Sequence, residues 1–218
     1  MWSAKSEIAD LYLSGRTFAT RTNGQVLLHP LTEDWMTSLQ SGLSDWPKRC
    51  WRIWLGGRRC GLHLCEPIEG VRSIEEAETA LGASLSVDAR AMEVRLATWS
   101  TAPRPWLAMA TEVGLIDGLM SVVADSAGSV CGVRPWWTMV STGDLSDAAM
   151  CDDETITYWR QSEPGIFSTA ATLWAVREQQ PATLQRLRIG GALTARRLEM
   201  EASFEQTPGF VVSLLNEM

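Results

Sequence analysis

The chain has 218 residues, of which 45% are hydrophobic and 21% charged, which supports one sizeable core and excludes a mainly disordered chain. Its formal net charge of −7 repels phosphate groups, so neither nucleic acid nor an anionic membrane surface is an expected partner. No apolar run is long enough to predict a signal peptide or a membrane span, and five scattered cysteines favour free thiols in a reducing cytoplasm.

The first 30 residues have the pattern of a three-stranded meander. A hairpin turn is expected at Thr22-Asn23-Gly24, because Asn and Gly tolerate positive φ angles, and Pro30 ends the last strand. The expected strands are Ile8–Leu13, Arg16–Arg21 and Gln25–Leu28. An amphipathic helix follows, since Trp35, Leu39 and Leu43 recur on one helical face.

Strands and helices alternate through the middle of the chain. Gly56-Gly57 predicts a hairpin turn between strands at Cys50–Leu55 and Arg59–Cys65. Ser73 and Glu76 form a capping box at the start of a helix that runs to about Leu85. Further strands are expected at Met92–Trp99, Trp106–Ala110 and Val130–Val133. The last two flank the strongest amphipathic helix, an order that favours parallel pairing between them.

A small, polar, acidic stretch from Ser141 to Glu154 is the expected boundary between two lobes. The first lobe would span residues 1–142 and the shorter second lobe residues 150–218, packed on the first. In the second lobe we expect a β hairpin, a helix, a strand and a further helix. These elements are Thr155–Arg160 with Ile166–Ala171, then Thr172–Gln179, Leu184–Ile189 and Ala192–Ser203. The predicted fold class is mixed α/β.

No complete catalytic or metal-binding motif is present. The sequence lacks a phosphate-binding GxxxxGK[ST] loop, a GxGxxG fingerprint and a GxSxG nucleophile elbow. His63 lies between Cys60 and Cys65, but on a strand Cys60 faces away from the other two, so no metal site is expected. A Cys–His nucleophile pair remains an alternative interpretation of the same residues.

Two short segments are candidate sites. Trp136 and Trp137 follow Arg134-Pro135 at the end of a strand, and neighbouring side chains of an extended chain point to opposite sides. We therefore expect one indole to be exposed as an interface anchor beside Arg134. The second segment is Gly190-Gly191, between a strand and a helix, where glycines permit close approach of a ligand or a neighbouring helix.

The element order resembles a ribonuclease-H-like, actin-like lobe, and Ile189-Gly190-Gly191-Ala192 resembles the adenosine-side glycine motif of actin-like ATPases. Three further segments are similar to degenerate actin-like cytoplasmic proteins of type IV pilus and type II secretion machines. These segments are Trp51–Arg59, Trp106–Ala127 and Val133–Trp137. The resemblance implies a platform that holds an assembly ATPase and inner-membrane partners together, with a mixed sheet flanked by helices.

The sequence departs from that family at both phosphate loops. An actin-like first loop carries Asp-x-Gly-Thr, whereas Asp10 is followed by Leu-Tyr-Leu-Ser-Gly, and the region near Asp153 also lacks the pattern. ATP hydrolysis is therefore not expected. A site for ATP and Mg²⁺, if retained, would use Asp10, Gly190 and Gly191.

Three functional hypotheses follow from these observations. The first is a non-catalytic cytoplasmic scaffold or adaptor of a bacterial pilus or secretion assembly, held at the inner membrane through its partners. The second is an enzyme or nucleotide-sized small-molecule binder with a cleft between the lobes. The third is an acidic regulatory or inhibitor-type protein, whose charge would match a basic target.

Overall fold

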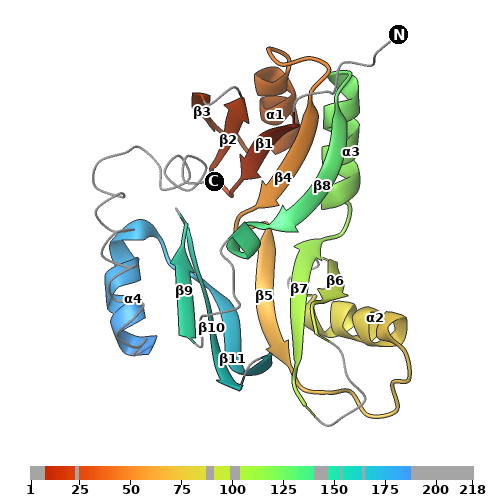
Figure 1. The fold of residues 1–218 in the computed structure, drawn as a ribbon, viewed down its shortest axis with the longest axis vertical. Helices are drawn as coiled ribbons and strands as arrows, with labels where there is room; N and C mark the ends of the chain where they lie inside the picture. Colours follow the sequence, from red (N-terminus) through yellow and green to blue (C-terminus); the bar gives the residue numbers. More distant parts are fainter. Residues whose placement is uncertain are drawn as a thin grey trace.

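The computed structural model describes residues 8–22, 25–86, 91–98, 104–139, 147–152, 154–163 and 165–187. Within them the strands form two sheets, one above the other in Figure 1. The strands are β1 (Ile8–Leu13), β2 (Thr17–Thr22), β3 (Gln25–Pro30), β4 (Cys50–Leu55), β5 (Cys60–Cys65), β6 (Met92–Leu96), β7 (Trp106–Glu112), β8 (Ser129–Pro135), β9 (Asp147–Cys151), β10 (Thr155–Glu163) and β11 (Ile166–Trp174). The helices are α1 (Trp35–Leu43), α2 (Ile74–Leu85), α3 (Leu115–Asp125) and α4 (Gln180–Leu187), with short 3-10 turns η1 (Trp136–Met139) and η2 (Arg177–Gln179).

Sheet A has five strands in the order β3-β2-β1-β4-β8. The predicted meander is confirmed, because β1 pairs antiparallel with β2, and β2 with β3. Strands β1, β4 and β8 then run parallel, which makes the sheet mixed. This strand order is that of a ribonuclease-H-like lobe, as the sequence predicted.

Helices α1 and α3 cover one face of sheet A (Figure 1). The core beneath them takes every second residue of the central strands, such as Leu11 of β1 and Ile53 of β4, together with Leu39 of α1 and Leu119 of α3. Apolar residues recur every second position in the strands and about every 3.6 positions in the helices, so each element turns one apolar face to the other and a single apolar layer forms between them. The opposite face of sheet A carries charged side chains, including Asp10 and Arg52.

Sheet B has six antiparallel strands in the order β6-β7-β5-β11-β10-β9. The predicted hairpin of β10 and β11 is confirmed. Helix α2 packs against one end of the sheet, and Ser73 is its N-cap, because the Glu76 N–H donates to Ser73 Oγ at 3.2 Å; the Glu76 carboxylate accepts from the Arg72 N–H at 2.9 Å instead of closing the predicted capping box on Ser73. Another core cluster joins residues of both sheets, among them Tyr12 and Trp54 of sheet A and Leu62 and Trp159 of sheet B.

Two predicted strand pairings and some predicted elements near the end of the described chain are wrong. Strands β4 and β5 do not pair as a hairpin, because the chain crosses from sheet A to sheet B at Gly56-Gly57. Strands β7 and β8 do not pair across α3, since they belong to different sheets. Residues 184–187 are helical within α4 and are not a strand. The helix expected at Thr172–Gln179 is also wrong, because that range holds the end of β11 and the 3-10 turn η2.

The proposed division at residues 142–150 stays a prediction. Sheet B combines β5, β6 and β7, which precede that boundary, with β9, β10 and β11, which follow it. The two groups meet where Ala171 of β11 pairs with His63 of β5. No helix in the described ranges is long and apolar enough to cross a membrane.

Candidate functional site

The chain leaves β8 through the 3-10 turn η1, which carries both candidate tryptophans. Trp136 is 0% and Trp137 5% exposed, so the expectation that one indole would be exposed is wrong. An extended chain would point the two rings to opposite sides, whereas the tight turn directs both into the core between the sheets. Trp136 meets the ring of Tyr12 edge-on at 6.4 Å, and Trp137 lies 6.2 Å from Trp159.

Trp137 and Arg134 nevertheless share one feature, a pocket of about 520 Å³ between the two sheets. Its walls come from the end of β8 and η1 on one side and from sheet B on the other. The lining is mostly apolar and includes Leu62, Leu107, Met109, Val133, Trp159 and Phe167. This volume falls in the range of pockets that hold small molecules or a few peptide side chains.

The polar groups around this pocket are two indoles, one arginine and two threonine hydroxyls. The buried indole N–H groups of Trp137 and Trp159, both lining residues, have no acceptor. Arg134 is exposed at the rim, and no ion pair holds it within the described part of the chain. An exposed arginine beside an apolar lining makes the pocket suited to an apolar occupant that also carries an acidic group.

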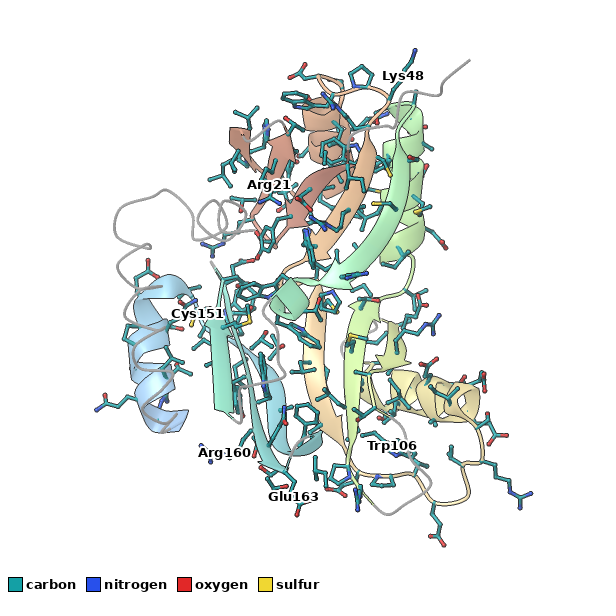
Figure 2. The ribbon with its side chains drawn as sticks, in the orientation of Figure 1. Arg21, Lys48, Trp106, Cys151, Arg160 and Glu163 are labelled. Atoms are coloured by element: carbon teal, nitrogen blue, oxygen red, sulfur yellow. The ribbon has the colours of Figure 1, made fainter. Side chains whose placement is uncertain are left out.

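A second feature is the contact between two turns, one after β1 and one after β9. Cys151, labelled in Figure 2, ends β9 at the start of the second turn. Arg16 Nε lies 2.9 Å from Glu154 Oε1, and a Cβ at Gly15 would lie only 1.8 Å from Glu154 Oε2. The chain's own side chains therefore fill the space between these turns.

Two buried carboxyl groups stand at this contact. Asp152 accepts hydrogen bonds from the N–H groups of Gly57 at 2.8 Å, Glu154 at 3.0 Å and Thr155 at 2.6 Å, and from Thr155 Oγ1 at 2.9 Å. Burial raises the pKa of Asp152 in spite of these bonds. Burial likewise raises the pKa of Glu154, which Arg16 opposes, and Glu154 Oε2 has no hydrogen-bond partner.

Asp10 lies in the middle of β1 rather than on a loop. Its carboxylate accepts hydrogen bonds from Arg52 Nε at 2.6 Å, from Trp54 Nε1 at 3.0 Å and from Arg21. Burial opposes ionisation, but these three donors outweigh it and lower the pKa of Asp10. The carboxylate therefore holds three strands of sheet A together, and its role toward a ligand stays a prediction.

The other candidates from sequence give no reactive centre. Burial raises the pKa of the Cys60 thiol to about 12, so little thiolate exists near neutral pH. Burial also lowers the pKa of His63. Among the described residues, no group of three His, Cys, Asp or Glu side chains could hold a metal ion. Gly190 and Gly191 lie outside the described residues.

Sequence reasoning missed the pocket between the sheets and the Arg16–Glu154 ion pair. Trp159 and Phe167 alternate with polar residues along the predicted hairpin. This alternation indicated that the two rings are buried, but it did not indicate which sheet they pack against. Glu154 stood in an acidic run that suggested a solvated loop, and no local signal pairs it with an arginine so far away in the chain.

No protein-family model matches the sequence, and no curated protein matches it. Solved structures are similar in fold. One is the cytoplasmic domain of EpsL, an inner membrane component of the type II secretion system of Vibrio cholerae, with 10% identity over 77% of this chain and 71% of that one, at a TM-score of 0.49. Another belongs to the PilM–PilN type IV pilus biogenesis complex, with 8% identity over 98% of this chain and 74% of that one, at a TM-score of 0.50. The chain thus has a mixed α/β fold that it shares with a protein of this pilus complex.

Proposed function

We propose that this chain is a non-catalytic scaffold of a bacterial pilus or secretion assembly, which binds a segment of a partner protein in the pocket between its two sheets. The observation that carries the proposal is the mostly apolar pocket between the two sheets, with the exposed Arg134 at its rim. The fold that the chain shares with a protein of the PilM–PilN complex supports the same class of assembly.

A peptide segment fits the chemistry of the pocket. Its apolar side chains would cover the leucine, methionine and phenylalanine lining. An acidic side chain or a carboxyl terminus would pair with Arg134. The partner we propose is the cytoplasmic segment of an inner-membrane component, with an assembly ATPase as a further partner at another surface.

A nucleotide-dependent role has less support. The turns after β1 and β9 stand where the actin-like resemblance places the phosphate loops, and the Arg16–Glu154 ion pair joins them. A phosphate group would have to displace that pair and approach two buried carboxyl groups of raised pKa, Asp152 and Glu154. We expect neither ATP nor ADP, with Mg²⁺, to bind with micromolar affinity in a calorimetric titration.

The experiment that tests the proposal titrates the chain with synthetic peptides that represent the cytoplasmic segments of the inner-membrane components of the same assembly. Arg134→Glu should lower the affinity for the peptide about tenfold, because it reverses the charge of the arginine at the rim of the pocket. Arg186→Glu makes the same charge change on the exposed face of α4 and should leave the affinity unchanged.

Equal losses in the two variants would point to a general charge effect and contradict binding in the pocket. Binding of none of the peptides, with tight and Mg²⁺-dependent ATP binding, would overturn the scaffold proposal in favour of a nucleotide-dependent function. Each variant is first compared with the natural chain by circular dichroism, so that loss of folding is recognised.

A further inference from the structure

Two cysteines from neighbouring parallel strands meet near the edge of sheet A. Cys50 begins β4, and Cys131 lies in β8, the edge strand that pairs with it. In the register, Cys50 lies opposite Ser129, Trp51 opposite Val130 and Arg52 opposite Gly132. Cys131 is therefore the extra residue of a β-bulge, and a bulge redirects the side chain it carries.

The thiol of Cys131 is held close to β4. Cys131 Sγ donates to the backbone carbonyl of Trp51 at 3.4 Å, next to Cys50 in sequence. Burial, followed by contact with the Cys50 thiol, raises the pKa of Cys131, while the nearby Arg52 opposes this. Cys50 lies opposite Ser129, so Cys131 is its diagonal neighbour on β8; the bulge shortens that diagonal, and the side chains of the two cysteines are in contact.

Access distinguishes this pair from the other cysteines, all of which are described. Cys131 is exposed and Cys50 is half-buried, whereas the remaining three, Cys60, Cys65 and Cys151, are buried. Cys60 and Cys65 are the two ends of β5, and Cys151 is at the end of β9. Only one pair is thus both accessible to reagents and in side-chain contact.

We propose that Cys50 and Cys131 are a redox modification site, and that they form a reversible disulfide that fastens edge strand β8 to β4. The oxidant is a low-molecular-weight disulfide such as oxidised glutathione. The Cys131 thiolate attacks one sulfur of the reagent, whose S–S bond breaks and releases one thiol. The Cys50 thiolate then attacks Cys131 Sγ in the mixed disulfide and releases the second thiol. Two protein thiols are oxidised and one reagent disulfide is reduced to two thiols.

The disulfide would restrain β8, the strand that leads into the proposed binding pocket. β8 continues directly into η1, and Arg134 and Trp137 follow Cys131 along it. The disulfide itself does not depend on the proposed function, because it rests on the bulge between β4 and β8 and on the contact between the two thiols. Since the pKa of the Cys131 thiol is raised, exchange should be slow near neutral pH and accelerate as the pH is increased.

The test incubates the folded chain with oxidised glutathione at about pH 8.5, a value near the ordinary thiol pKa. Free thiols are then blocked with an alkylating reagent, and the products are mapped by mass spectrometry. We expect two blocked sites fewer per chain and a linked peptide pair containing Cys50 and Cys131, both reversed by dithiothreitol. Cys50→Ser and Cys131→Ser should each abolish the link and leave a glutathione adduct on the remaining cysteine.

A matched control moves the exposed thiol away from Cys50. The double variant Cys131→Ser with Val113→Cys places it at a residue that is 61% exposed in the loop before α3, and it should give only the glutathione adduct. The proposal is overturned if the natural chain yields only glutathione adducts on Cys50 and Cys131. It is also overturned if the link forms only in urea, or if it joins other cysteines.

Discussion

At the scale of single residues, Asp10 pairs with two arginines, Arg21 and Arg52. It is 4% exposed and accepts from side chains on β2 and β4. Asp10→Ala would leave Arg21 and Arg52 without their partner on the sheet. We expect a loss of about 2–3 kcal/mol in the free energy of unfolding. Breaking a fully buried ion pair costs roughly 3–5 kcal/mol, and the loss here should be smaller because Arg52 keeps contact with water.

Urea unfolding of Asp10→Ala and Asp10→Asn measures this contribution. Asn keeps the volume and an oxygen acceptor for Trp54 Nε1 but loses the charge, so its loss should be the smaller of the two. A loss below about 0.5 kcal/mol in both variants, the range of ordinary surface changes, would show that the cluster adds nothing to stability.

Cys60 allows a second prediction at this scale. Its thiol is buried and its pKa is raised to about 12, so an alkylating reagent at pH 7.5 should leave it unmodified in the folded chain. Peptide mapping after brief labelling should find Cys131 modified first. Rapid modification of Cys60 in the folded state would revive the Cys–His nucleophile of the enzyme hypothesis.

At the scale of elements, two helical glycines should respond to alanine in opposite ways. In α3, a Cβ at Gly118 would lie 3.3 Å from Met36 Sδ, the end of an exposed and flexible side chain, and 3.3 Å from Trp35 Cη2, the edge of a half-buried indole that must shift by a few tenths of an ångström. Alanine is better in a helix by about 1 kcal/mol, so Gly118→Ala should stabilise the chain by about 0.5 kcal/mol. In α1, a Cβ at Gly42 would lie 2.3 Å from Cζ of the buried Phe18.

Phe18 is 1% exposed and cannot move aside, so Gly42→Ala should cost about 1–2 kcal/mol after its gain in helix propensity. Thermal unfolding of the two variants beside the natural chain checks both signs. If Gly42→Ala were the more stable variant, Phe18 would have room that the packing of β2 on α1 does not provide.

Elements with a complete local pattern were predicted well. The β1–β3 meander followed from its turn residues, and α2 from the Ser73 N-cap. Pairing was predicted poorly, because Gly56-Gly57 is equally compatible with a hairpin and with a crossing between sheets. There, Gly57 is required for close approach, since a Cβ would lie 2.1 Å from Thr155 Oγ1, a contact no local pattern reveals.

The candidate site was predicted in part for the same reason. Arg134 and Trp137 were singled out from sequence, and both line the pocket, although the direction of the indole depends on a 3-10 turn that alternation does not predict. Trp159 escaped notice because its significance lies in the strand it faces across the core. Partners distant in the chain are decided by tertiary packing, which one sequence does not display.

At the scale of the whole molecule, sheets A and B are linked by the two turns that meet at Arg16 and Glu154. A carboxyl group there is protonated more readily in the folded chain than in the unfolded one, because burial raises the pKa of Glu154 above its usual 4.5. The folded state therefore binds more protons, and this group's contribution falls as the pH rises through the interval that begins near 4.5. The pKa of Asp152 is also raised, so its contribution to stability likewise falls as the pH rises.

Asp10 acts in the opposite direction at lower pH. Its pKa is below the usual 3.8, so the stability it contributes is present above that value and is lost as the pH falls through the lowered pKa. Together these groups predict greatest stability between about pH 4 and 5, near the isoelectric point of about 4.9, with a decline toward neutrality.

Urea midpoints of the natural chain and Glu154→Gln, measured from pH 4 to pH 8, test this prediction. The natural chain should lose stability across the range, and the variant should lose less, because glutamine keeps an oxygen for Arg16 and carries no proton equilibrium. The residual slope of the variant then reports Asp152 and the general repulsion of a chain with net charge −7. Parallel slopes for the two proteins would mean that Glu154 titrates alike in the folded and unfolded chains, and that the contact between the turns is open to water.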